Sequence, residues 1–344
     1  MTPFALPLAL AVAAVLVTAA VLRLRKSPLS VLGAAGLTAL LALPIIVFST
    51  SNALFYGWTL FYILPALSGF VSVLLYTRNS PHRRWCECAL AASLSVIFEG
   101  VGLLFLAQEG VICILMAAPL ALGLALAGGQ SAYILQRQLR NPLASTRLLL
   151  LLVLAAPVLM GAESAVDRKP PVYAVRTAVE VDAPPSVVWK NVISFSQLPP
   201  PDDWLFSTGI AYPIRAEIQG TGVGAVRYCV FSTGAFVEPI EVWDEPRLLR
   251  FSVTDNPPSM HELSPWGDIH PPHLEGFLVS RRGQFRLTEL PGGRTRLEGT
   301  TWYSHGLYPA SYWRLWSDWI IHRIHLRVLR HVARVSEEQA GKRI

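Results

Sequence analysis

Six long apolar runs dominate the first half of the chain, and this pattern stops near Gly161. The runs are about Thr2–Leu22, Leu29–Phe48, Leu54–Tyr76, Ala89–Ala107, Val111–Ala127 and Leu148–Ala162. A helix of about 20 apolar residues is long enough to cross a bilayer. The mean hydropathy of +0.42 over 344 residues is also too high for an ordinary soluble protein. The sequence therefore predicts six membrane spans followed by a domain of soluble composition.

The formal net charge of +6 comes mostly from the membrane half. Before Asp167, nine Lys and Arg residues stand against four Asp and Glu residues, whereas from Asp167 onward twenty stand against nineteen. A nucleic-acid-binding protein would carry its basic surface in the soluble half. We therefore expect no nucleic-acid partner.

The charged loops alternate with uncharged ones, which predicts how the spans are oriented. RLRK, TRNSPHRR and QRQLRNPLASTR follow the first, third and fifth runs, whereas STSNALFYG and QEG, after the second and fourth, contain no Lys or Arg. By the positive-inside rule, both termini of this multi-pass protein are extracytoplasmic, in a cell (plasma) membrane. The short run Leu148–Ala162 contains Pro157, and if it does not cross, the C-terminal domain is cytoplasmic. The charges after Leu22 mark the first run as a retained span, because a cleavable signal carries them before its apolar run.

Glu99 is the only acidic residue well inside a predicted span, which makes it a candidate for function. Its alternative role is packing, with a hydrogen bond to Ser or Tyr on another helix. No second intramembrane charge supports a transporter. Cys86 and Cys88 lack a second pair at zinc-ribbon spacing, and no other motif predicts a metal or a cofactor.

The second half predicts a strand, a helix, six strands in meander and one long helix. The strands are Tyr173–Val181, Tyr212–Ile218, Ala225–Phe231, Phe236–Trp243, Leu248–Val253, Gly283–Leu290 and Thr295–Tyr303; the helices are Ala183–Ile193 and about Pro309–Gln339. Only the last helix is long enough to cover an apolar sheet face. The fold class is thus an α-helical transmembrane bundle followed by an α+β helix-grip domain, a curved antiparallel sheet of about seven strands wrapped on a long C-terminal helix. The predicted boundaries are 1–163 for the spans, 164–171 for a linker, 172–338 for the domain and 339–344 for a tail.

Residues 172–338 resemble a known superfamily in the order of their motifs. The motifs are VEVDAPPSVVWKNVISF, GTGVGAVRYCVF, EPIEVWDEPRLLRFSV, the pair GQFRLTEL and GGRTRLEGTTWY, and the helix YWRLWSDWIIHRIHLRVLRHV. In this order they resemble the START-related superfamily called SRPBCC, which includes polyketide cyclase/dehydrase-like and lipid-transfer domains. The resemblance implies a cavity for a hydrophobic ligand and, in some members only, catalysis.

Asp318, His322 and His325 lie beside the apolar face of the closing helix, where neighbouring pairs meet on adjacent turns. Two imidazoles and a carboxylate could bind a metal or move protons, and they are the candidate catalytic residues. They could instead recognise the polar head of a ligand, or satisfy one another and the backbone. Because D-x3-H-x2-H is a weak motif, we predict ligand binding and no metal.

Two further segments carry candidate contacts. Trp316, Trp319, Arg323, Arg327 and Arg330 follow one side of the same helix and predict contact with the membrane surface, unless they form a solvated face. The long segment 256–277 predicts a lid over the cavity, with Met260 and Trp266 touching the ligand, unless it is an ordered surface loop. Its histidines and Glu262 lack the spacing of H-E-x-x-H.

These features together predict membrane-anchored binding of a hydrophobic or amphipathic molecule, such as a lipid or isoprenoid, with transfer or sensing as possible purposes. The partners are the lipid bilayer and that ligand, and the sequence identifies no protein partner. One alternative is a cyclase, dehydratase or hydrolase acting on a polyketide-like or lipid substrate. Another is a membrane scaffold or sensor without ligand chemistry.

Overall fold

The computed structural model describes residues 29–51, 56–78, 80, 82–138, 151, 158–163, 169–267 and 269–341. The chain divides into two compact units. Unit 1 comprises Met1–Arg168 together with Glu262–Pro272, and unit 2 comprises Lys169–His261 together with His273–Ile344.

Unit 1 is built from apolar helices. They are α2 (Val31–Ser51), the short π-helix η2 (Thr59–Ile63), α3 (Leu64–Thr77), α4 (Trp85–Phe105) and α5 (Val111–Gln138). Four stretches are long and apolar enough to cross a membrane: Val31–Phe48, Thr59–Thr77, Trp85–Phe105 and Val111–Gln138. These confirm four of the six predicted spans. The predicted span Thr2–Leu22 and most of Leu148–Ala162 lie outside the described residues.

Small residues set the distance between α3 and α5. A Cβ atom added to Gly69 would lie 1.9 Å from the carbonyl oxygen of Ala125, and one added to Gly128 would lie 1.9 Å from that of Ala66. Glycines at such contacts let two membrane helices approach closely, which increases their van der Waals packing. The pairing of α3 with α5 therefore depends on the absence of side chains at these positions.

The two ends of the unit 1 bundle differ in charge. At one end, Trp85 at the start of α4 lies 5.4 Å from Tyr133 near the end of α5, measured between ring centroids. The nearby side chains at this basic end include Arg83, Arg84 and Arg137. At the other end, the Tyr56 hydroxyl before η2 donates to Glu109 in the turn between α4 and α5, at 3.0 Å. No Lys or Arg occurs among the described residues 56–59 and 106–110, and we call this the neutral end.

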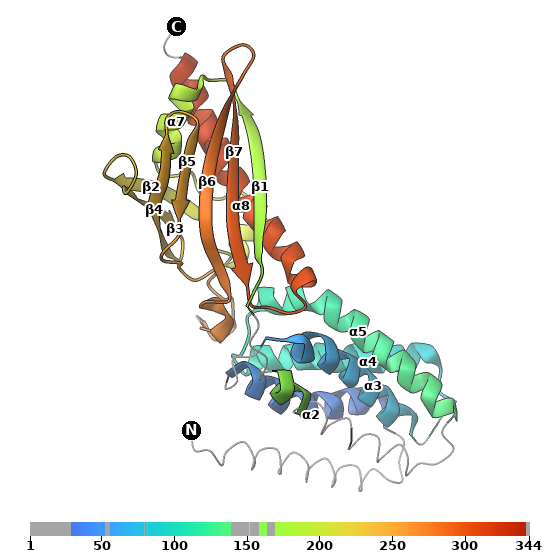
Figure 1. The fold of residues 1–344 in the computed structure, drawn as a ribbon. Coiled ribbons are helices and arrows are strands. Elements are labelled where there is room, and N and C mark those ends of the chain that lie inside the picture. The colour runs from blue at the N-terminus through green and yellow to red at the C-terminus, as the bar shows by residue number, and fades with distance from the viewer. Residues whose placement is uncertain are drawn as a thin grey trace, which may run out of the picture. The chain divides into compact units, whose positions relative to one another are not determined.

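Unit 2 is one antiparallel sheet that curls around a long helix, as Figure 1 shows. Its strands are β1 (Val172–Val181), β2 (Pro213–Gln219), β3 (Val226–Phe231), β4 (Gly234–Asp244), β5 (Leu248–Ser252), β6 (Leu278–Leu290) and β7 (Arg294–His305), in the spatial order β1-β7-β6-β5-β4-β3-β2. The helices are α7 (Pro185–Ile193) and α8 (Ala310–Gly341), with the 3₁₀ turns η3 (Trp204–Thr208) and η4 (Pro272–Leu274). This is the predicted helix-grip arrangement, and all seven predicted strands are confirmed.

Local sequence explains how these elements begin and turn. Pro185 occupies the first turn of α7, where its missing N–H costs nothing. The β6–β7 turn contains Gly292 and Gly293 with φ of 83° and 72°, values that L side chains rarely adopt. Both features stand where the sequence predicts them.

The core of unit 2 lies between the sheet and the helices α7 and α8. Alternate residues of β1 point toward α8, with Val175, Thr177 and Val181 buried. The apolar core includes Trp189 of α7, Leu249, Leu297, Leu329 and Val332, each no more than 1% exposed. We call the sheet surface that faces this core the inner face.

Candidate functional site

A chain of hydrogen bonds joins α8 to the sheet near the middle of the helix. The Thr177 hydroxyl on β1 lies 2.8 Å from His322 Nδ1 and 3.1 Å from His325 Nδ1. His325 Nε2 lies 2.8 Å from the Thr301 hydroxyl on β7. Thr177 therefore links the two predicted histidines, and both ring nitrogens of His325 have hydroxyl partners.

Burial determines the charge state of His325. It lowers the pKa of His325 to about 4, with a smaller contribution from His322 in the same direction. His325 is therefore neutral at pH 7, with one nitrogen donating and the other accepting. Thr177 can accept a hydrogen bond from one imidazole and donate its own hydrogen to the other.

Asp318 belongs to a different group at the start of α8. Tyr303 donates to Asp318 Oδ1 at 2.6 Å, and Arg314 Nε donates to Asp318 Oδ2 at 3.0 Å. The Ser317 hydroxyl lies 2.7 Å from the Tyr303 hydroxyl. Burial and the Asp318 carboxylate raise the pKa of Tyr303, which stays protonated. The predicted triad is thus divided into a histidine pair and an aspartate that holds a tyrosine.

A buried ion pair forms the third polar group of the inner face. Arg227 of β3 and Glu238 of β4 are directly cross-strand partners and form a salt bridge, with side chains 1% and 8% exposed. The Arg227 guanidinium carbon lies 5.4 to 5.5 Å from three ring centroids, those of Phe195, Phe251 and Phe285. Its Nε donates to the Ile193 carbonyl at 3.1 Å, whereas Nη2 has no hydrogen-bond partner among the described residues.

The sequence analysis missed Arg227 and Glu238, although a signal was present. In an alternating strand, residues two apart lie on the same face of the sheet. Arg227 stands between the buried apolar residues Ala225 and Cys229, and Glu238 precedes the buried Ile240 by two positions. A charged residue at an inward position needs a partner or a function. Only the β3–β4 register shows that the two residues pair.

The predicted lid residues lie in different units. Met260 is 8% exposed and forms a β-bridge with Ile210 inside unit 2. Trp266 belongs to unit 1, where its indole N–H donates to the Leu104 carbonyl at the end of α4, at 3.1 Å. Of the two residues of this segment predicted to touch the ligand, Met260 thus belongs to unit 2 and Trp266 to unit 1.

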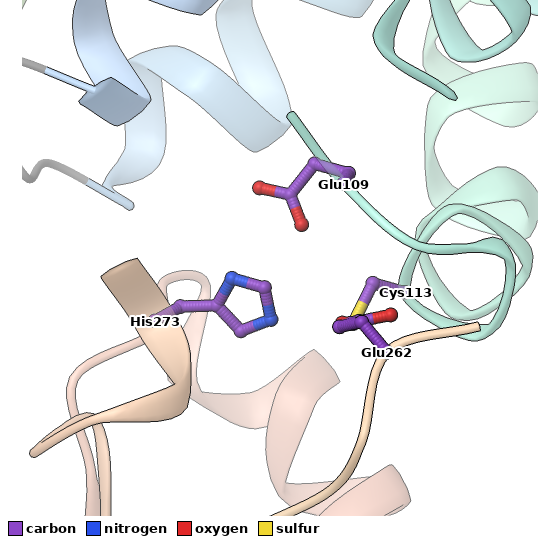
Figure 2. Close-up of side chains that lie close together, drawn as sticks. All are labelled: Glu109, Cys113, Glu262 and His273. Carbon is purple, nitrogen blue, oxygen red and sulfur yellow. The ribbon is translucent and has the colours of Figure 1, made fainter. Parts of the chain in front are cut away.

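The segment around Glu262 contributes to a second polar cluster, at the neutral end of unit 1. The Cys113 thiol donates to Glu262 Oε1 at 2.7 Å, and the Val111 N–H donates to the Leu263 carbonyl at 3.0 Å. Ligand atoms of Glu109, Cys113 and Glu262 lie within 4.8 Å of one another. Figure 2 shows these three side chains; His273, also drawn there, belongs to unit 2. Sequence spacing could not reveal this cluster, because Glu262 is 149 residues from Cys113.

Glu99 lies within α4, where its side chain is 5% exposed and has Ser68 of α3 as a hydrogen-bond partner. A serine on another helix is the partner expected for a packing role. Among the described part of the spans there is no cationic partner for this carboxylate.

The residues of α8 predicted to contact the membrane surface differ in their surroundings: some make hydrogen bonds within unit 2 and others are exposed. Arg323 donates to Asp203 at 2.7 Å, and Arg327 donates to the Pro199 carbonyl at 2.6 Å. Trp319 is 37% exposed, and Trp316 is partly exposed. Arg330 is exposed to solvent. Two of the three arginines thus hold neighbouring loops of unit 2.

Comparisons with known proteins concern the C-terminal half. No family model and no curated protein matches the sequence. Zhui aromatase/cyclase from Streptomyces sp. R1128 is 16% identical, with a TM-score of 0.32 over 49% of this chain and 96% of that chain. Norcoclaurine synthase from Thalictrum flavum is 12% identical, with a TM-score of 0.33 over 50% and 99%. XoxI from Bacillus cereus is 15% identical, with a TM-score of 0.31 over 47% and 94%. At these identities and TM-scores, the matches carry no conclusion about activity.

Proposed function

We propose that unit 2 binds a hydrophobic or amphipathic small molecule, such as a lipid or isoprenoid, whose head carries an oxygen atom. The observation that carries this proposal is the Arg227 guanidinium. It is almost completely buried on the inner face, and its Nη2 has no acceptor among the described residues. A binding protein anchored in a membrane would exchange such a molecule with the bilayer.

Energetics support a ligand at this position. A buried donor without a partner costs about 1–3 kcal/mol, and more when it is charged. An oxygen of a ligand would remove that cost, while Phe195, Phe251 and Phe285 would contact its apolar body. Small-molecule sites commonly combine mostly apolar walls with a few fixed polar groups. The His322 imidazole, which Thr177 links to His325, adds a further hydrogen-bonding group on the inner face.

A direct test uses the full-length protein in detergent and cis-parinaric acid, a fluorescent polyene with a carboxylate head. We expect saturable binding that weakens at least about tenfold, equivalent to about 1.4 kcal/mol, when Arg227→Met and Glu238→Leu are combined. The double variant removes both charges together, so the fold is expected to survive. Unchanged binding in a folded double variant would place the probe among the spans and contradict the proposal.

We also propose that unit 2 lies on the extracytoplasmic side of the plasma membrane. The basic end of unit 1 faces the cytoplasm by the positive-inside rule. Glu163, which precedes unit 2 by a few residues, lies at the neutral end, where it accepts from the backbone N–H groups of Trp58 and Thr59 at 2.8 and 2.9 Å. The segment Glu262–Pro272 also meets the neutral end, at Val111 and Cys113. Glu163 and the segment Glu262–Pro272 thus support the same side.

Fusions to the C-terminus of the full chain test this orientation. We expect a fused alkaline phosphatase, which requires an oxidising compartment, to be active, and a reporter that works only in the cytoplasm to stay silent. Strong cytoplasmic signal would show that the neutral end faces inward and would overturn the assignment.

A further inference from the structure

Three exposed apolar side chains and one partly exposed one, Trp316, gather on one side of unit 2. The ring centroids of Trp204 in η3 and Trp319 in α8 are 6.1 Å apart, and those of Trp316 and Trp319 are 6.4 Å apart. Leu315, one turn before Trp319, is 70% exposed, and Trp204 is 64% exposed. We call these four residues the tryptophan patch. Contiguous exposed apolar surface of this kind marks a contact with another protein or with a membrane.

The patch is held rigidly by polar contacts behind it. Arg323 of α8 donates to Asp203 Oδ2 at 2.7 Å, while Asp203 Oδ1 accepts from the Leu205 N–H and so caps η3. Arg327 donates to the Pro199 carbonyl and fixes the chain that leads to η3. Trp204 is therefore presented in place before any partner binds, which lowers the entropy cost of an interaction.

The patch stands at the end of unit 2 from which the chain leads to unit 1. Tyr173 is close to Lys169, where unit 2 begins. The guanidinium carbon of Arg314, at the start of α8, lies 4.9 Å from the ring centroid of Tyr173. His261, the last residue before the unit 1 segment Glu262–Pro272, donates its N–H to Gly209, the residue that ends η3. Two of the three points at which the chain passes between the units thus lie close to the elements that carry the patch.

We propose that the tryptophan patch inserts into the interfacial layer of the phospholipid bilayer that holds unit 1. Indole rings favour this layer because their apolar body contacts acyl chains while the N–H stays hydrated. The exposed side chain of Leu315 adds aliphatic depth. Because the patch is tethered to spans in the same chain, the bilayer is present at high effective concentration, whereas a second copy must diffuse to it. The contact stands apart from ligand binding and does not depend on Arg227.

The test places a nitroxide spin label on the full chain in vesicles of phosphatidylcholine and phosphatidylglycerol. The labelled variants are Leu315→Cys and, as control, Val223→Cys, in a background with Cys86→Ser and Cys113→Ser. Val223 is 69% exposed and lies in the β2–β3 turn, before the start of β3. The other end of β3 leads to Ser232, whose carbonyl is 3.4 Å from Nε2 of His261, the residue next to the unit 1 segment. Val223 therefore lies at the end of β3 away from that connection. We expect the label at 315 to collide more with oxygen, which concentrates in acyl chains, than with a water-soluble nickel chelate. The label at 223 should show the reverse.

A second variant makes the result specific to the patch. Trp204→Ser combined with Trp319→Ser should move the label at 315 toward water while circular dichroism stays unchanged. Equal, water-like collision rates at 315 and 223 would overturn the proposal. Dipolar broadening between labels at 315 that grows with the protein-to-lipid ratio would identify a second copy as the occupant and would overturn it as well.

Discussion

The buried pair of Arg227 and Glu238 offers a sharp test of how unit 2 is held together. We consider Glu238→Gln, which keeps the shape of the side chain and removes its charge. The Arg227 guanidinium would then remain in the core, 1% exposed and surrounded by three phenylalanine rings, without a counter-charge from β4. Removing one partner of a buried ion pair costs about 3–5 kcal/mol.

This cost is large compared with the stability of a typical domain, which is about 5–15 kcal/mol. For a domain of this size, each kcal/mol shifts the midpoint of thermal unfolding by about 2–4 °C. The expected decrease is therefore about 6–20 °C. The matched control is Glu241→Gln on the same strand, because Glu241 pairs with Arg282 at 3.3 Å near the surface. An exposed pair of this kind contributes about 0–1 kcal/mol.

The assay is thermal unfolding of the full-length protein in nanodiscs, followed by near-ultraviolet circular dichroism. Hydrogen exchange of peptides from β3 and β4 assigns the change to unit 2. We expect Arg227→Met combined with Glu238→Leu to recover most of the loss, since two apolar side chains can replace a buried pair at little cost. If Glu238→Gln shifted the midpoint no more than Glu241→Gln, the charge of Glu238 would not stabilise the domain and the reasoning would be refuted.

Three further predictions test other parts of the structure. The pKa of His325 falls from its ordinary value of 6.5 to about 4 in the folded state, so the unfolded state takes up more protons between these pH values. Acidification through this window therefore destabilises unit 2, by about 3 kcal/mol. In urea titrations, His325→Gln should show a smaller pH dependence of stability than wild type, and equal pH dependence would contradict the assignment. Thr177→Val removes the hydroxyl between the two histidines and should cost about 1–3 kcal/mol in the same titrations, whereas Thr288→Val on the exposed side of β6 should cost almost nothing. In unit 1, Gly128→Ala places a methyl group against the Ala66 carbonyl and should destabilise the bundle by about 1–3 kcal/mol. The control is Gly123→Ala on the same helix, where the added methyl group has open space. Equal thermal stability of the two variants would argue against the close contact of α3 with α5.

Local patterns in the sequence determined much of the architecture. Apolar runs of span length predicted the helices from α2 to α5, because crossing a bilayer requires continuous apolar sequence. Alternation and turn residues predicted all seven strands, since a half-buried strand repeats every two residues. The length of α8 predicted that the sheet would close on it. Each of these inferences uses residues that are neighbours in the chain, and their physics is local.

Tertiary structure alone decided which side chains meet. Helical spacing placed His322 and His325 together, but their partner Thr177 is 145 and 148 residues away and is assigned only by the packing of α8 on β1. Asp318 shares their helix, yet its hydrogen-bond partners are Tyr303 of β7 and Arg314 of α8. The pairing of Arg227 with Glu238 follows from strand register, and the placement of Glu262–Pro272 in unit 1 follows from contacts with Val111 and Cys113. A periodicity states which face a residue occupies, whereas the partner on that face depends on the twist, register and packing of distant segments.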